Sequence, residues 1–290
     1  MTRVRAEYRA ALERALPALF TPPEPGDATE FLAQELCLSH FHFHRLFAAL
    51  VGETPGAFVR RIRLERAAMA IREGMSISEA ALGAGYETSQ AFAKAFRAAY
   101  RLSPTEWRAA GLAVRLPSSS QLHWGQIWRL ASPTTNAMKL SIQNLPSHRL
   151  AYLEHRGAYP QIGPVFGRLA GIVGAAGLHG TPGVQDVGMY FDDPCAVPEP
   201  ELRSWAATTL PEDAPLPEGL SEGRLDGERY AVWTHMGSYQ RMTEGWMEAY
   251  RAVAESGEKI RPAVPFELYV NTHDEVPEEE LRTDLHIPIE

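Results

Sequence analysis

The residues best suited to chemistry in this sequence are a glutamate and the aromatic side chains near it. Glu267 stands in the alternating segment PFELYVN (265–271), between Phe266 and Leu268 and two residues before Tyr269. Because side chains two apart share one face of a strand, Glu267 and Tyr269 should point the same way. A carboxylate beneath aromatic rings attracts an organic cation through charge and cation–π contact. The alternative, and the commoner case for a glutamate, is a solvated residue on a half-exposed strand.

A second set of residues has the chemistry to read DNA bases. The segment 77–108, ISEAALGAGYETSQAFAKAFRAAYRLSPTEWR, predicts a short helix over 77–84, a turn at Gly85 and a second helix capped by Thr88 or Ser89. The apolar face of that second helix is Phe92, Ala95 and Phe96. Its outer face carries Ser89, Gln90, Ala91 and Lys94. Gln can bond adenine, Ala can meet a thymine methyl, and Lys can take guanine or a phosphate.

The same pattern occurs once before, at an offset of 49 residues, which pairs Phe43 with Phe92 and Arg45 with Lys94. In this first copy Ser39 should cap the reading helix. Its outward residues should be His40, Phe41, His44 and Arg45. The arginine-rich helix over 55–72, which includes Arg61, could follow a phosphate backbone. His40 and His44 share a face, but no third ligand completes a tetrahedral set, so we expect no metal site.

The distribution of charge divides the chain. Residues 1–137 hold 16 Lys and Arg against 12 Asp and Glu, a net +4, while residues 138–290 hold 12 against 24, a net −12. A basic half suits polyanions and an acidic half suits cations. We expect an N-terminal extension (1–28), an all-α domain (29–112), a Pro/Ser/Thr-rich linker (113–137) and an α+β domain (138–290). The absence of a long apolar run and of a signal sequence, with only two cysteines, favours a cytoplasmic protein with no membrane contact.

The acidic half is also a duplication, at an offset of 80 residues. This offset pairs His155, Gly157 and Tyr159 with His235, Gly237 and Tyr239. Short alternating runs predict strands, and two helical patterns lie around 162–176 and 241–255. A pocket between the copies could be lined by aromatic residues besides Tyr269. The candidates are Tyr152, Tyr190, Trp205 and Trp233.

The first half resembles the DNA-binding domain of the AraC/XylS family of transcription regulators. The motifs SxFHFHRLF, GETPGAFVRRIRLERA and SPTEWR follow the family order over about 29–111. The resemblance implies two helix-turn-helix units joined by a long helix, which read two adjacent major grooves of double-stranded DNA. One departure is Arg101, which stands where the family often has the glycine that ends the second reading helix.

The second half resembles a GyrI-like (SHS2-pair) small-molecule-binding domain, in the stretches LPSHRLAYLEHRGAYPQIGPVF, ERYAVWTHMGSYQRM and PFELYVN. The resemblance implies two βαββ modules and a groove that binds lipophilic, often cationic, compounds, with Glu267 as the recurrent carboxylate. Some such domains hydrolyse small electrophiles, but the sequence has no GxSxG, HExxH, GxxxxGK[ST] or CxxC motif.

The combined prediction is a two-domain α+β protein, with an all-α double helix-turn-helix joined to a duplicated βαββ domain. We expect a DNA-binding transcription regulator that senses a small lipophilic or cationic molecule, without enzyme activity and without a cofactor. RNA polymerase is a further candidate partner. The alternative is a drug-sequestering or detoxifying hydrolase domain attached to a DNA-binding domain.

Overall fold

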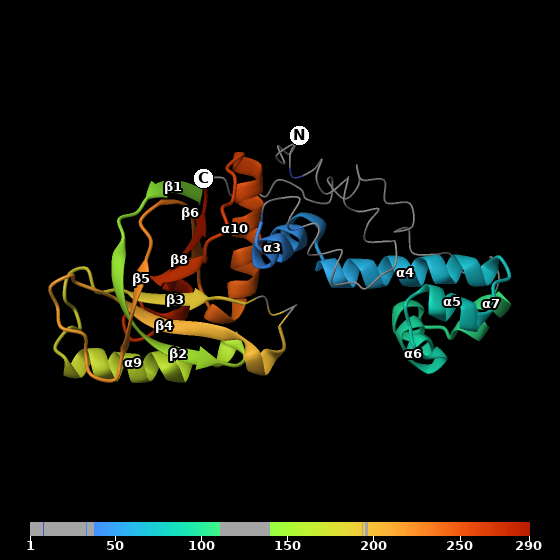
Figure 1. Ribbon diagram of the computed structural model, residues 1–290, viewed down its shortest axis with the longest axis horizontal. Helices are drawn as coiled ribbons and strands as arrows, with labels where there is room; N and C mark the ends of the chain where they lie inside the picture. Colours follow the sequence, from blue (N-terminus) through green and yellow to red (C-terminus); the bar gives the residue numbers. More distant parts are fainter. Residues whose placement is uncertain (1–7, 9–32, 34–37, 111–139, 193, 195–196) are drawn as a thin grey trace.

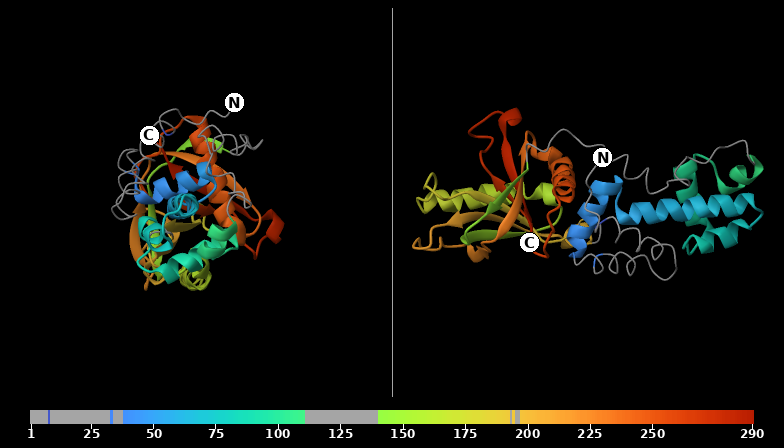
Figure 2. Two further views of the ribbon diagram at one scale, coloured as in Figure 1. Left: turned by 90° about the vertical axis from the view of Figure 1, so that its right-hand side faces the viewer. Right: turned by 90° about the horizontal axis from the view of Figure 1, so that it is seen from above.

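An α+β domain lies at one end of the molecule and a small helical unit lies at the other, with one long helix between them (Figures 1 and 2). The computed structural model describes residues 8, 33, 38–110, 140–192, 194 and 197–290. The predicted N-terminal extension lies outside the described residues except for Tyr8, and the predicted linker lies wholly outside them.

The described helices of the first half are α3 (His40–Val51), α4 (Pro55–Arg72), α5 (Ile77–Gly83), α6 (Ser89–Tyr100) and α7 (Pro104–Ala110). Two of them, α3 and α6, begin at side-chain caps that the sequence predicts. Ser39 accepts a hydrogen bond from a backbone N–H in the first turn of α3, and Thr88 does the same for α6. A left-handed residue ends each of these two helices, Gly52 at φ 87° and Arg101 at φ 61°. The equivalent boundaries of α3 and α6 confirm that the domain is a repeat.

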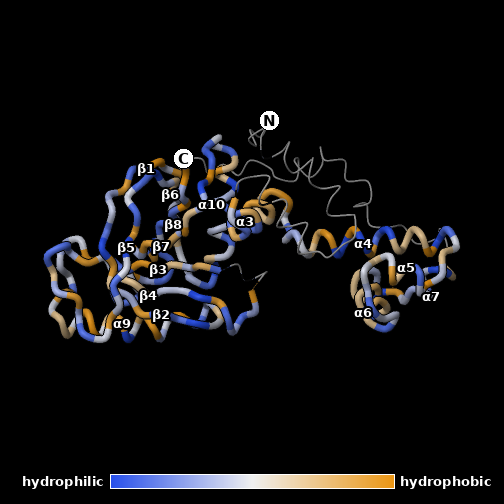
Figure 3. Tube along the Cα trace, in the orientation of Figure 1, coloured by the Kyte–Doolittle hydropathy of each residue, from blue (hydrophilic) through white to orange (hydrophobic). Residues whose placement is uncertain are grey.

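The two ends of α4 pack in different hydrophobic cores. Hydrophobic and hydrophilic residues alternate along the helix, because each end has one face in a core and another in solvent (Figure 3). Its C-terminal half packs with α5, α6 and α7, around Phe92, Phe96 and Trp107. The indole of Trp107 donates a hydrogen bond to the carbonyl oxygen of Ala68 on α4 at 3.0 Å. The N-terminal end packs with α3 in a core that continues into the second domain. α4 therefore connects the second helix-turn-helix unit to the remainder of the molecule.

The second half forms one antiparallel sheet of eight strands in the order β1-β6-β8-β7-β3-β4-β2-β5. The first copy contains β1 (Leu140–Asn144), β2 (His148–Arg156), α9 (Gly163–Ala175), β3 (Asp186–Tyr190) and β4 (Arg203–Leu210). The second contains β5 (Ser221–Leu225), β6 (Arg229–Met236), α10 (Met242–Ser256), β7 (Phe266–Tyr269) and β8 (Arg282–Pro288). The predicted duplicated βαββ fold is confirmed, with one more strand in each copy.

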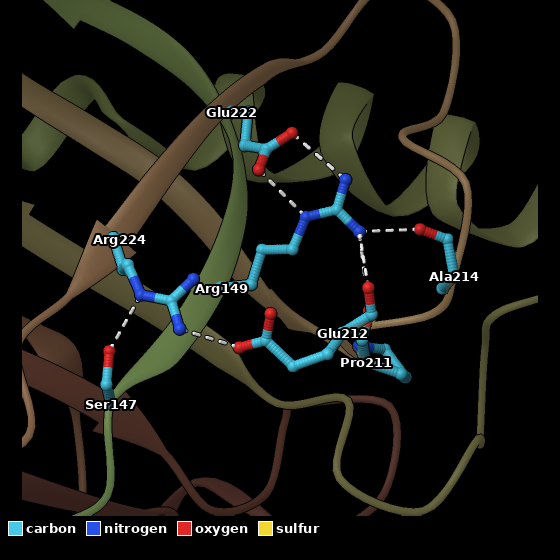
Figure 4. A network of polar contacts seen from close by, with 7 residues as sticks. All are labelled: Ser147, Arg149, Pro211, Glu212, Ala214, Glu222 and Arg224. Atoms are coloured by element: carbon cyan, nitrogen blue, oxygen red, sulfur yellow. Dashed lines mark hydrogen bonds and ion pairs between the residues drawn. The ribbon is translucent and has the colours of Figure 1, made fainter.

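Each copy gives its first strand to the other, because β1 pairs with β6 and β5 pairs with β2, while the copies meet at β3 and β7. A polar network holds β5 against β2 (Figure 4). Arg149 on β2 donates to both oxygens of Glu222 on β5 at 2.9 and 3.0 Å, and to the carbonyl oxygen of Ala214 at 2.6 Å. Arg224 donates to Ser147 Oγ and Glu212 Oε1, both at 2.9 Å. The exchange of strands is therefore fixed by charged pairs as well as by the backbone ladder.

Candidate functional site

The candidate ligand site lies in the middle of the sheet, between the two helices of the α+β domain. α9 packs against β2 and β4, and α10 packs against β6 and β8. Both helices cover one face of the sheet, since their partners Ala206 and Leu285 belong to the cross-strand row that also contains Glu267 and Gly188. The strands that join the copies, β3 and β7, occupy the interval between the helices.

Glu267 is buried at the centre of this interval, with 4% of its surface exposed. Its Oε2 accepts hydrogen bonds from the hydroxyls of Tyr269 at 2.7 Å and Tyr190 at 3.2 Å. Its Oε1 accepts a hydrogen bond from the indole Nε1 of Trp246 on α10 at 2.8 Å. Burial raises the pKa of Glu267, while these hydrogen bonds and the charge of Arg45 act in the opposite direction. The carboxyl group is held by neutral donors, so a cation placed beside it would offset its lost hydration.

Tyr190 and Tyr269 remain protonated donors in this cluster. Burial, followed by the charge of Glu267, raises the pKa of both phenols well above the usual value. Each phenol is packed by an equivalent residue of the repeat, Tyr159 against Tyr190 and Tyr239 against Tyr269, at centroid distances of 4.8 and 5.4 Å. The local twofold arrangement thus surrounds one carboxylate with rings from both copies.

Gly188 makes room for the cluster. It pairs directly with Glu267 across β3 and β7. A Cβ atom at this position would lie 2.9 Å from the hydroxyl of Tyr269 and 3.1 Å from that of Tyr190. Only glycine at this point lets both phenols reach the carboxylate.

The structure brings together three of the six predicted ligand residues, namely Glu267, Tyr269 and Tyr190. Trp233 is a correction: it shares their face, but it is 2% exposed in the core beneath α10 rather than lining the site. Tyr152 and Trp205 are also corrections, because they stack on each other at 3.8 Å on the opposite face. The cross-strand register places Ala206 and Leu153 in the row of Glu267, so their neighbours along β4 and β2 must point the other way.

Trp246 is the residue that sequence reasoning missed. It comes from a helix rather than from a strand, and it reaches Glu267 only because α10 packs across β6 and β8. An available signal was its place on the apolar face of an amphipathic helix, four residues before Tyr250.

On the DNA side, the second helix-turn-helix unit presents its predicted reading face to solvent. Ser89, Gln90, Ala91 and Lys94 are all exposed on α6, and Phe92 and Phe96 are buried beneath them. The turn before α6 has Gly85 at φ 79°, as a tight turn requires. This geometry leaves the four side chains available to base edges.

The first unit differs from expectation. Phe41 and His44, predicted to face outward, are buried with 8% and 7% of their surfaces exposed. Ser39 and His40 are partly exposed. Arg45 does not extend into solvent, since its guanidinium lies over the rings of Phe41 and of Trp246 at 4.4 and 4.6 Å. The physical reason is that α3 packs against α10, which a repeat within the helical domain cannot reveal.

Arg61 is a further correction. Its guanidinium donates to Glu53 at 3.0 Å and to Glu65 at 3.2 Å, so two carboxylates already hold it on α4. These hydrogen bonds oppose the effect of burial and raise the pKa of Arg61. In the structure, Arg61 links Glu53, just before α4, to Glu65, one turn further along α4, and its guanidinium is not left free for a phosphate.

The described part of the chain contains no group of three His, Cys, Asp or Glu side chains placed to hold a metal ion. His155 and His235 occupy equivalent places and make local contacts, to Ser204 Oγ at 3.0 Å and to the carbonyl oxygen of Ser238 at 3.3 Å. No helix among the described residues has the length and hydropathy to cross a bilayer.

Comparisons with known proteins give a separate match for each half of the chain. Residues 138–290 match the model of the GyrI-like small molecule binding domain, and residues 32–110 match a helix-turn-helix domain. An uncharacterized HTH-type transcriptional regulator of Haemophilus influenzae is 34% identical over 98 residues, which are 33% of this chain and 33% of that protein. The chain thus covers about a third of the first curated relatives that it matches.

The α+β domain has relatives of its own. The probable transcriptional regulator YgiV of Escherichia coli K12 is 28% identical over 160 residues, 54% of this chain and 99% of that protein. The crystal structure of the EcmrR C-terminal domain is 13% identical, with a TM-score of 0.42, and covers 52% of this chain and 96% of that one. Since the first model spans more than half of its residues, the chain belongs to the GyrI-like small-molecule-binding family and carries an AraC-type helix-turn-helix domain before that domain.

Proposed function

We propose that this protein is a one-component transcription regulator, in which the helical domain (29–112) binds two adjacent major grooves and the α+β domain (138–290) binds a lipophilic cation. The observation that carries the ligand class is the buried carboxylate of Glu267, held by neutral donors from three aromatic side chains. Burial without a full counter-charge is costly, and a cation over aromatic rings relieves that cost. The proposed location of the protein is the cytoplasm, where DNA is accessible. RNA polymerase is a further proposed partner there.

The duplicated domain supports the DNA half of the proposal. α4 is an 18-residue helix, about 27 Å long, and it joins the two predicted reading helices, while successive major grooves on one face of DNA lie about 34 Å apart. We therefore expect two half-sites centred about 10 bp apart on one face of DNA. The second candidate is a drug-sequestering or detoxifying hydrolase domain attached to a DNA-binding domain, and turnover of a small electrophile measured without DNA would favour it.

The test is the variant Glu267→Gln, which keeps the shape of the side chain and removes its charge. It should weaken tetraphenylphosphonium by about 1–3 kcal/mol, while the neutral triphenylphosphine oxide loses little. Isothermal titration with both compounds measures this directly. The equally conservative change Glu218→Gln, at an exposed glutamate of the α+β domain, should alter neither affinity. Equal losses for the charged and the neutral compound would show that the site selects by shape alone.

A further inference from the structure

The side chain of Arg45 belongs to two sites at once. It stands on α3 at the position that Lys94 holds on α6, and it also lies over Trp246, whose indole donates to Glu267. The guanidinium is enclosed by rings from both domains, Phe41 on one side and Trp246 on the other. A DNA-reading position thus contacts the aromatic wall of the ligand site.

The enclosure leaves the guanidinium incompletely satisfied. Among the described residues, the buried Nη1 of Arg45 has no hydrogen-bond partner. A buried donor without a partner is costly, whereas a guanine edge or a phosphate would satisfy it. The ring contacts hold Arg45 in place through charge and polarisability, which are the same forces that would hold an organic cation.

The contacts between α3 and α10 form one stripe that borders the reading face. His42 Nδ1 lies 2.7 Å from the hydroxyl of Tyr250, and Arg251 Nε donates to the carbonyl oxygen of Ala49 at 3.1 Å. Positions 42, 45 and 49 share one side of a helix. Since Phe41, His44 and Arg45, the residues predicted to read DNA, adjoin this stripe, α3 cannot enter a major groove about 12 Å wide while α10 lies against it.

The second reading helix lacks any such partner among the described residues. The α+β domain makes its helix contacts with α3, at the far end of α4 from α6 (Figure 1). Lys94 is exposed where Arg45 is enclosed. In the free protein, therefore, the predicted reading face of α6 is exposed to solvent, while α3 is packed against α10.

We propose that Arg45 is a tethered cation of the ligand site, and that a lipophilic cation and the DNA-reading helix α3 compete through it. A cation bound at Glu267 repels Arg45 and takes its place on Trp246. α3 then leaves α10, and Arg45 becomes available to a base edge. Ligand binding in this scheme adds the first half-site to a protein that already reads the second.

This inference rests on the proposed function, and its first test needs no DNA. Arg45→Ala should bind tetraphenylphosphonium about 10-fold more tightly than the wild type, because the resident cation is gone. The affinity of Arg45→Lys for tetraphenylphosphonium should lie between those of the wild type and Arg45→Ala. Arg241→Ala removes an exposed arginine from the start of α10 and should leave the affinity unchanged. Equal affinity in Arg45→Ala and the wild type would overturn the proposal.

The second test uses residues of α10 outside both proposed binding sites. Tyr250→Phe removes the hydroxyl that meets His42, and Arg251→Ala removes the contact to Ala49. Both should raise DNA affinity in the absence of ligand by about 10-fold and reduce the effect of tetraphenylphosphonium on it. The duplex is one selected from a random library by the wild-type protein, and Arg241→Ala is again the control.

Footprinting distinguishes failure of the tethered-cation proposal from failure of the proposed function. With tetraphenylphosphonium the wild type should protect two half-sites, and without it one. Ligand binding and DNA binding that are each measurable yet independent would overturn the tethered-cation proposal and leave the proposed function standing. Absence of either binding event in the folded wild-type protein would overturn both.

Discussion

At the scale of single residues, the candidate ligand site depends on an asymmetry within a duplicated domain. Gly188 and Glu267 occupy equivalent positions, 79 residues apart, as do Tyr190 and Tyr269. One copy supplies the carboxylate and the other supplies the space for it. The two equivalent tyrosines therefore donate to a single carboxylate, because only the second copy carries a glutamate at this position.

Gly188→Ala should disrupt this site without touching Glu267. The added methyl group would lie about 3 Å from both phenol oxygens, so at least one tyrosine must leave the carboxylate. We expect about 10-fold weaker binding of tetraphenylphosphonium by titration, with a fall in Tm. Gly171→Ala on α9, where a Cβ meets nothing within 4 Å, should instead raise stability by about 0.5–1 kcal/mol. Unchanged ligand affinity in Gly188→Ala would contradict the geometry of the cluster.

His42 makes the contact between the domains sensitive to acid. Burial lowers the pKa of His42 from 6.5 to about 4, so the folded state disfavours the imidazolium form. Because the unfolded chain binds the proton more readily, the contribution of neutral His42 to the free energy of unfolding is present above pH 6.5. This contribution is lost as the pH falls towards 4. A shift of this size corresponds to up to about 3 kcal/mol.

The comparison of wild type with His42→Gln measures this contribution. The free energy of unfolding in urea, taken between pH 7.5 and 4.5, should fall more steeply for the wild type than for the variant. His286, whose pKa burial also lowers to about 4, remains in both proteins and cancels from the difference. Parallel pH profiles would show that His42 does not carry the effect.

At the scale of elements, equivalent helices of the two helix-turn-helix units end in the same backbone conformation but at different residue types. α3 ends at Gly52, in the left-handed conformation that glycine adopts without strain. α6 ends in the same conformation at Arg101, the one residue other than glycine with positive φ in the described ranges. The departure noted in the sequence has therefore left the backbone geometry intact at an energetic cost.

Arg101→Gly should recover that cost. We expect the midpoint of urea unfolding to rise, by an amount equivalent to about 1 kcal/mol. Gly52→Ala, the reverse change at the equivalent position, should lower stability by a similar amount, since nothing lies within 4 Å of the added Cβ and only φ opposes it. A destabilised Arg101→Gly would mean that the arginine side chain makes a contribution larger than the strain.

The sequence predicts elements better than it predicts the faces that meet. Caps and periodicity place α4 at Pro55–Arg72 and pair Glu267 with Tyr269, because both signals are local. The assignment of Tyr152 and Trp205 to the site is wrong because the face of a strand relative to a distant strand depends on register, which aromatic content does not reveal. Arg45 is misplaced for a related reason: its neighbour on α10 is 201 residues away in the chain.

At the scale of the whole molecule, the charge division acquires a physical consequence. The acidic α+β domain lies against α3, the first predicted reading helix, so its negative charge opposes the approach of DNA to that end. Release of α3 would increase the number of phosphates that the protein contacts.

The salt dependence of DNA binding should report this change. For the wild type, the slope of log affinity against log salt concentration should become steeper when tetraphenylphosphonium is added, by about 0.9 for each added phosphate contact. Fluorescence anisotropy with the selected duplex from 50 to 300 mM salt measures both slopes. In Tyr250→Phe the two slopes should already be similar. A wild-type slope that does not respond to the cation would mean that the number of phosphate contacts is constant.

The single uninterrupted helix α4 also sets the rotational phase of the protein on DNA. Each residue of an α-helix turns the chain by about 100° and advances it by about 1.5 Å. The 18 residues of α4 therefore amount to about five whole turns, so the length of this helix fixes the rotation of α5 and α6 relative to α3 about its axis. A chain with one residue more in α4 would keep both predicted reading helices intact and rotate one relative to the other by about 100°. The length of α4 is thus a constraint on operator choice that no base-contacting side chain records.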